Sequence, residues 1–214
     1  MNREGILFII SAPSGTGKSS LIKEFLKKKK ILNIRVSISH TTRNIRPGEH
    51  QGEHYYFVSI KQFNNMIKNN FFLEYAKVFN HYYGTSKKNI YRFLSNGIHV
   101  LLDIDWQGAK QIRSVIERTC SIFLLPPSKK ELYRRLRNRN QDSDSVIYNR
   151  MNLSISEIMH YKEYDYVIIN DNFNLAVLEL ELIIQSERSC IRYQKKKYDF
   201  LIKKLLKEKL LLNK

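Results

Sequence analysis

The sequence has few cysteines and no long apolar segment, and both absences limit what kind of protein it encodes. Only two of its 214 residues are cysteines, Cys120 and Cys190. Two cannot build the disulfide framework of a small secreted domain, so we expect a reducing compartment. No apolar run approaches the roughly 20 residues that span a membrane. The run Ile6–Ile10 is too short for a signal-peptide core and enters a glycine loop directly. We therefore expect a cytoplasmic protein without a membrane partner.

Acidic residues are also scarce relative to basic ones. The chain has 20 Asp and Glu against 37 Lys and Arg, which gives a formal net charge of +17. Such a surplus is typical of proteins that bind nucleic acids or nucleotides. AT-rich coding also produces it, because it enriches Lys, Asn and Ile together. We favour the coding explanation for the scattered lysines and expect no specific nucleic-acid partner, whereas arginines clustered in loops need a separate explanation.

Short apolar runs bounded by turns alternate with stretches of helical spacing. We predict strands at residues 6–11, 34–39, 55–58, 71–79, 98–104, 121–125 and 166–169. We predict helices at 18–30, 60–68, 87–94, 129–137 and 146–161, another that ends at residue 117, and helix for the rest of the chain after residue 169. Residues 80–86 are predicted to be a turn. Buried strands alternating with helices predict a single α/β domain with a parallel sheet flanked by helices.

The clearest motif follows the first predicted strand. It reads SAPSGTGKSS and matches the phosphate-loop pattern G-x-x-x-x-G-K-[ST], except that Ala12 stands at the first glycine. Backbone N–H groups of Gly15, Gly17 and Lys18 can converge on phosphate at the start of a helix, and the Lys18 ammonium can reach the β- and γ-phosphates. A methyl group at Ala12 is tolerable if φ there is negative. The motif predicts a nucleotide site, with the Ser19 hydroxyl as a Mg²⁺ ligand.

Two further groups of charged residues complement this loop. Asp103 and Asp105 end an apolar strand, on the rim where the phosphate loop of an open α/β sheet also lies. Their carboxylates could hold Mg²⁺ directly or through water; the alternative is an Asp that only caps the following helix, which the nearby phosphate loop makes the less favoured interpretation. Arg43 and Arg46 lie in a Gly/Pro-rich loop upstream of Tyr55, and guanidinium groups suit a phosphate dianion. A second anion site beside the first predicts phosphoryl transfer to a phosphorylated acceptor, although a solvated basic loop is the alternative for this segment alone.

Six segments, in order, resemble the guanylate kinase family: SAPSGTGKSS, SHTTRNIRPGEHQGEHYYFV, FLEYAKVFNHYYGTS, LDIDWQG, PPSKKELYRRLRNRNQDSDSVIYNRM and YDYVIIND. The resemblance covers nearly the whole chain. It implies that ATP and GMP give ADP and GDP with Mg²⁺, and that dGMP is also used, for purine nucleotide recycling and GTP supply. It implies a P-loop nucleoside-monophosphate-kinase core at 1–39, 88–127 and 161–214, a GMP-binding insertion at 40–87 and a lid at 128–160.

The resemblance also implies site residues. Those for GMP are Ser39, Arg43, Arg46, Tyr55, Glu74, Tyr83, Thr85 and Asp105. The arginines and tyrosines among them would hold the phosphate, and the others would lie near guanine. Chemistry supports Glu74, because one carboxylate can accept both N1–H and N2–H₂ of guanine, and a site with such polar groups rejects a base that leaves them unpaired. For Glu74 taken alone, a structural carboxylate is the alternative.

On the ATP side the resemblance implies binding by Ala12, Pro13, Ser14, Gly15, Thr16, Gly17, Lys18, Ser19, Asn170 and Asp171. Lys18 and the lid arginines Arg135, Arg139 and Arg150 would be catalytic, neutralising charge on the transferred phosphoryl group. The metal would be held by Ser19 and Asp103.

The chain departs from the family at a few positions. Asn138 and Asn140 stand where the family often has glycines beside the lid arginine, and Asn172 replaces a common Asp.

The tail from Arg192, with Tyr198, Leu201, Leu205 and Leu210, is predicted to be a docked amphipathic helix with a lysine-rich outer face. His50 and His54, four residues apart in a glycine-rich loop without a cysteine partner, are predicted to be ordinary loop histidines and not zinc ligands.

Three rival functions remain open on the sequence. A catalytically inactive guanylate-kinase-like binding module would share the fold, but such modules typically have damaged phosphate loops. A P-loop kinase that acts on another small substrate is the second rival, and Glu74 together with the Tyr82–Thr85 segment argues against it. A nucleic-acid-binding protein rests on the charge alone. The sequence leaves open whether the protein forms a homo-oligomer.

Overall fold

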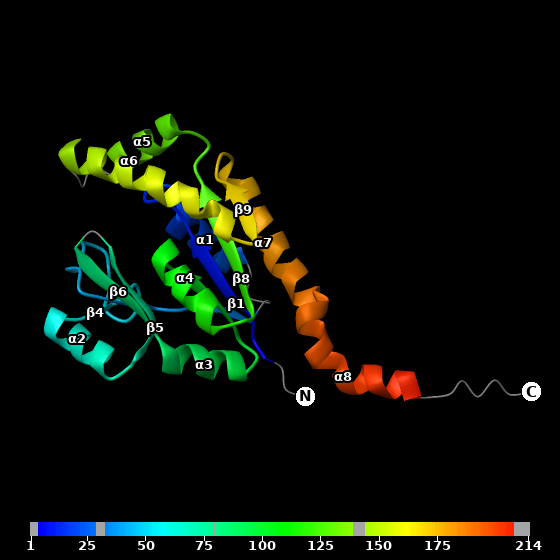
Figure 1. The fold of residues 1–214 in the computed structure, drawn as a ribbon. Helices are drawn as coiled ribbons and strands as arrows, with labels where there is room; N and C mark the ends of the chain where they lie inside the picture. The colour runs from blue at the N-terminus through cyan, green and yellow to red at the C-terminus, as the bar shows by residue number, and fades with distance from the viewer. Residues whose placement is uncertain (1–3, 29–32, 79, 139–143, 208–214) are drawn as a thin grey trace, which may run out of the picture.

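The fold is built around a parallel sheet (Figure 1). The computed structural model describes residues 4–28, 33–78, 80–138 and 144–207. The sheet has the order β2-β7-β1-β8-β9, with every neighbouring pair parallel. Its strands are β1 (Leu7–Ser11), β2 (Ile34–Val36), β7 (His99–Asp103), β8 (Thr119–Leu125) and β9 (Tyr166–Ile169). The predicted parallel α/β sheet is confirmed.

Helices cover both faces of this sheet because its central strands are apolar on both sides. On one face, Phe8 and Ile10 pack with α1 (Lys18–Lys28) and α7 (Phe173–Ser189). On the other face, Leu7 and Ile9 pack with α3 (Lys87–Ser95) and α4 (Trp106–Val115). Successive strand side chains point to opposite faces, so a strand buried on both sides must be apolar without alternation.

A second, smaller sheet lies beside the first in Figure 1. Its order is β4-β3-β6-β5, formed by β3 (His40–Thr41), β4 (Tyr56–Phe57), β5 (Phe72–Val78) and β6 (His81–Ser86). Helix α2 (Ile60–Lys68) covers it through the buried Phe63, whose ring stacks on Phe72 and Tyr82.

The predicted turn at 80–86 is wrong, since β6 pairs antiparallel with β5 from His81 to Ser86. Gly84 resembles a turn residue in the sequence, but its role is packing: a Cβ there would lie 2.8 Å from the Phe72 ring. The predicted strand at 34–39 is likewise too long, because β2 ends at Val36 and the chain then leaves for the second sheet.

Helices α5 (Lys129–Arg137) and α6 (Asp144–Ile158) pack against each other above the sheet, and a 3₁₀ turn η2 (Met159–Glu163) follows them (Figure 1). Their shared core is small, formed by Leu132, Leu136, Ile147 and Met151.

The tail forms a helix, α8 (Ile191–Lys207), but the prediction that it docks is wrong. It points away from the body of the molecule (Figure 1), and Phe200 and Leu206 are each 81% exposed. Its start is anchored, where Tyr193 packs on the core and Arg192 pairs with Glu187 at 3.1 Å. Cys190 has an extended backbone that ends α7 and turns the chain outward. Leu210 lies outside the described residues. No helix in the described part of the chain is long and apolar enough to span a membrane.

Candidate nucleotide site

A cavity of about 480 Å³ lies between the carboxyl ends of β1 and β7, the second sheet and α6. Most residues predicted for the site line it. They are residues 12–19, Ser39, Arg43, Arg46, Tyr55, Glu74, Tyr83, Asp103, Asp105 and Arg150. Residues that are up to about 140 positions apart in the sequence thus line one cavity. The phosphate loop faces it, and so does the loop that holds Arg43, Arg46 and Glu49, which we call the second anion loop.

The phosphate loop has the backbone that the motif requires. Gly15 and Gly17 have φ of +92° and +100°, in the left-handed region that favours glycine. At Gly17 a Cβ would lie 2.7 Å from the Asn170 side-chain nitrogen. Ala12 is not among the described residues with positive φ, so its methyl group adds no backbone strain. The loop therefore keeps its geometry without the first glycine.

Lys18, Ser19 and Asp103 form a compact polar group at the base of the cavity. The Lys18 ammonium lies 2.6 Å from Asp103 Oδ1 and donates to the Ile104 carbonyl at 3.0 Å. The Ser19 hydroxyl lies 3.4 Å from Asp103 Oδ2. A hydroxyl and a carboxylate are the hard oxygen donors that Mg²⁺ prefers. Within the described ranges, no cluster of three or more His, Cys, Asp and Glu residues is placed to hold a metal ion.

The second anion loop is organised by a carboxylate that the sequence reasoning missed. Glu49 accepts from Arg43 Nη2 at 2.7 and 2.9 Å and from the Arg46 backbone N–H at 2.9 Å. The Arg43 guanidinium also lies over the Tyr55 ring, 5.5 Å from its centroid. Glu49 thus holds the Arg43 side chain and the Arg46 backbone, and its place three residues after Arg46 in the Pro-Gly turn was the available signal.

The carboxylate predicted to lie near guanine is buried. Glu74 is 3% exposed, and the Thr85 hydroxyl donates to its Oε1 at 2.5 Å. Burial raises the pKa of Glu74 to about 7. Because the Thr85 hydroxyl donates its hydrogen bond to Glu74, it is not available to a ligand, whereas the Ser39 hydroxyl lines the cavity.

Gly108, in the first turn of α4, leaves room for this carboxylate. A Cβ there would lie 2.5 Å from Glu74 Oε2. We expect Gly108→Ala to raise KM for GMP about tenfold by displacing one charged hydrogen-bond acceptor, while the gain of about 1 kcal/mol in helix propensity offsets part of the stability cost of that displacement. Steady-state kinetics with each substrate varied in turn checks this. An unchanged KM for GMP, or an equal rise in KM for ATP, would argue against Glu74 as a GMP ligand.

A second carboxylate that the sequence reasoning missed comes from α6. Glu157 lines the cavity, interacts with the Ser14 backbone N–H, and has its pKa raised to about 7 by burial. It lies seven residues after Arg150, two helical turns along the same face. That spacing could have identified it once Arg150 was placed at the site. His54, predicted to be an ordinary loop histidine, also lines the cavity.

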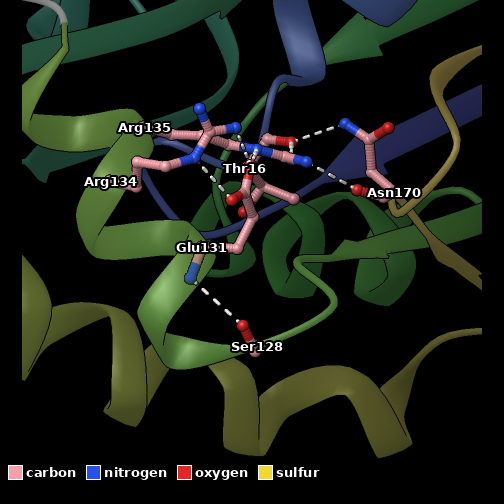
Figure 2. Close-up of polar contacts among 6 residues, drawn as sticks. All are labelled: Thr16, Ser128, Glu131, Arg134, Arg135 and Asn170. Atoms are coloured by element: carbon pink, nitrogen blue, oxygen red, sulfur yellow. Dashed lines mark hydrogen bonds and ion pairs between the residues drawn. The ribbon is translucent and has the colours of Figure 1, made fainter.

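The remaining predicted residues lie around the cavity and do not line it. Thr85 contacts Glu74, and Asp171 is exposed after β9. Arg135 and Asn170 contact the phosphate loop from outside, at the Thr16 carbonyl (Figure 2). Arg139 and Asn140 lie outside the described residues, whereas Asn138 caps the end of α5 in ordinary helical conformation.

Comparisons with known proteins agree with this geometry. The family model described as guanylate kinase matches residues 4–187. The chain is 64% identical to a guanylate kinase of Buchnera aphidicola subsp. Acyrthosiphon pisum, over 95% of this chain and 99% of the relative. It is 57% identical to one of Yersinia pestis, over 95% and 98%. The crystal structure of guanylate kinase from Anaplasma phagocytophilum superposes with a TM-score of 0.72 at 33% identity, covering 87% of this chain and 88% of that one. The chain therefore belongs to the guanylate kinase family.

Proposed function

We propose that this protein is a kinase that transfers the γ-phosphoryl group of ATP to GMP, giving ADP and GDP. The observation that carries the proposal is one cavity lined by an intact phosphate loop, by Arg43 and Arg46 in the loop that Glu49 braces, and by a buried carboxylate suited to guanine. Family membership supports the same reaction.

The donor half holds ATP through the loop. Backbone N–H groups at the start of α1 and the Lys18 ammonium face the β- and γ-phosphates. Ser19 and Asp103 would hold Mg²⁺, which supplies neutralisation of phosphate charge when bound. Lys18 leaves Asp103 for the nucleotide phosphates, because phosphate oxygens replace the carboxylate as its partner.

The acceptor half holds the GMP phosphate between Arg43, Arg46, Tyr55 and Tyr83. A phosphate acceptor oxygen is already anionic near neutral pH, so no general base is needed, and positioning with charge stabilisation supplies the catalysis. Arg150, on the cavity wall, would stabilise the transferred group. Arg139 is proposed for the same role from the family pattern.

Guanine is selected by hydrogen-bond complementarity. Glu74 accepts from N1–H and N2–H₂, and Ser39 donates to O6. Adenine would place a lone pair against Glu74 and leave that buried carboxylate unpaired. None of these contacts involves the ribose 2′-hydroxyl, so dGMP is also a substrate.

Residues 40–87 form the GMP-binding region and 128–160 a lid that excludes water. We place the enzyme in the cytoplasm, in purine nucleotide recycling and GTP supply.

The raised pKa of Glu74 gives a pH test. Its ionised form is the one that accepts both guanine donors, and the burial that raises its pKa to about 7 makes that form decline as pH falls below 7. We expect kcat/KM for GMP to fall severalfold from pH 8 to pH 6, because this ratio reports ionisations of the free enzyme. The GMP phosphate has its own pKa near about 6, so Glu74→Gln is the control: its residual activity should lose the step near 7. A flat wild-type profile over this range would contradict the assignment.

The proposed function is tested by ADP release from Mg·ATP with GMP, dGMP, AMP, CMP, UMP or dTMP, added one at a time. We expect turnover with GMP and weaker turnover with dGMP, with one GDP formed per ADP. Folded protein that binds GMP yet turns over no acceptor would instead be a binding module.

A further inference from the structure

The carbonyl of Thr16, inside the phosphate loop, is held from outside the cavity by two side chains. Arg135 Nη1 donates to it at 3.0 Å and Asn170 Nδ2 at 2.7 Å (Figure 2). The rest of Thr16 is equally fixed, since its hydroxyl donates to the Pro13 carbonyl at 2.8 Å and the residue is fully buried. Neither Arg135 nor Asn170 is among the residues that line the cavity.

The direction of that carbonyl determines the direction of a phosphate ligand. The Thr16 C=O and the Gly17 N–H belong to one peptide unit, and in a planar trans peptide they point in opposite directions. A carbonyl held toward α5 and β9 therefore aims the Gly17 N–H toward the cavity. Gly17 can adopt this conformation because its φ is +100°. A cationic donor on the carbonyl also polarises the peptide and strengthens the N–H as a donor.

Arg135 is itself held by the carboxylate of Glu131, which has no role in the proposed function described above. Glu131 Oε1 accepts from Arg135 Nε at 2.7 Å, while Arg135 Nη2 donates to the Asn170 carbonyl at 3.0 Å. Each of the three nitrogens of the planar guanidinium thus donates to a different acceptor, an arrangement that a lysine could not reproduce. Hydrogen bonds from Arg134 and Arg135 lower the pKa of Glu131 to about 2, so it stays ionised at neutral pH.

We propose that Glu131, Arg135 and Asn170 form a clamp that fixes the Thr16–Gly17 peptide, so that the Gly17 N–H meets the nucleotide phosphate. Arg135 and Asn170 act on the loop, and Glu131 is a positioning residue that orients Arg135. The clamp belongs to the ATP side of the proposed function and rests on it. It also ties α5, the first helix of the proposed lid, to the loop that it would cover.

The chain provides a matched pair of variants. Arg134 and Arg135 both bond Glu131 at 2.7 Å, but Arg134 does so on the exposed side and only Arg135 reaches the loop. Arg135→Gln and Glu131→Gln should raise Kd for ADP and KM for ATP about tenfold, as expected for weakening one charge-assisted contact, and leave KM for GMP within twofold. Arg134→Gln should match the wild type in all three constants.

A spectroscopic measurement separates positioning from stability. The chain has eight glycines, so ¹⁵N-glycine labelling gives a spectrum simple enough to follow Gly17. Adding ADP to the wild type should shift the Gly17 amide resonance strongly, and both clamp variants should show a clearly smaller shift at saturating ADP. Wild-type ADP affinity and Gly17 shift in Glu131→Gln and Arg135→Gln would overturn the clamp, as would a fall in Tm without any loss of ADP affinity. If Arg135→Gln fails to fold, Glu131→Gln decides. Because ADP binding needs no acceptor, a wild type that shows the shift but never phosphorylates GMP would refute the function and leave the clamp standing.

Discussion

Replacing Lys18 with alanine is expected to lower kcat for GMP phosphorylation by at least about 10³-fold, the scale for removing a preorganised charge from a phosphoryl-transfer site. Lys18 is the cation at the base of the phosphate loop, and its ammonium already lies beside Asp103 and the Ile104 carbonyl. Position 18 is where α1 begins, and the Lys18 side chain lines the cavity. Coupled detection of ADP at saturating ATP and GMP measures the loss.

The control is Lys23→Ala, which removes an exposed lysine of the same helix. It should retain wild-type kcat, and both variants should keep the wild-type circular dichroism spectrum. Most of the activity surviving in Lys18→Ala would refute the assignment of the phosphate loop.

Replacing Glu74 with glutamine is expected to lower kcat/KM for GMP about 10²-fold while KM for ATP stays within twofold. Glutamine has nearly the same shape, so the cavity keeps its volume, but its amide NH₂ meets the N–H donors of guanine where a carboxylate accepted them. One of the two acceptor oxygens becomes a donor, so one guanine N–H loses its acceptor and meets a buried N–H instead; the lost charged acceptor and the two unsatisfied donors together cost roughly 3 kcal/mol, which corresponds to this factor. Kinetics with GMP and AMP as alternative acceptors measures both the loss and the change in base preference.

Glu53→Gln is the matched control, since Glu53 is an exposed carboxylate before β4 that does not line the cavity. An unchanged kcat/KM for GMP in Glu74→Gln, with the preference over AMP intact, would leave Glu74 as a structural carboxylate only.

Local sequence signals predicted the core of this fold well. β1, the loop and α1 are contiguous, and their apolar run, glycines and helical spacing each report a local requirement. The parallel sheet follows from uninterrupted apolar runs such as Leu7–Ser11, which only a doubly covered strand needs. Most of the residues drawn from the family resemblance line one cavity, and their individual roles stay predictions.

Features that depend on tertiary packing were predicted less well. β6 was mistaken for a turn because Gly84 is glycine for contact with the Phe72 ring, not for backbone freedom. The apolar stripe of α8 predicted docking, yet amphipathicity does not show where a surface to dock on lies. Glu49, Glu131 and Glu157 went unrecognised because each acts through an arginine or a backbone group that the fold brings close.

The central claim is that one cavity selects GMP by its guanine base through Glu74, and that the γ-phosphoryl group of ATP is transferred there to the GMP phosphate. Competition between equal concentrations of GMP, IMP and AMP for labelled γ-phosphate tests this claim most directly, with the labelled diphosphates separated afterwards. IMP keeps N1–H and O6 but lacks the N2 amino group, so it removes only one of the contacts assigned to Glu74. We predict that labelled GDP exceeds labelled IDP by about tenfold or more, with labelled ADP at background. Comparable labelling of GDP and IDP, or of GDP and ADP, would contradict the claim.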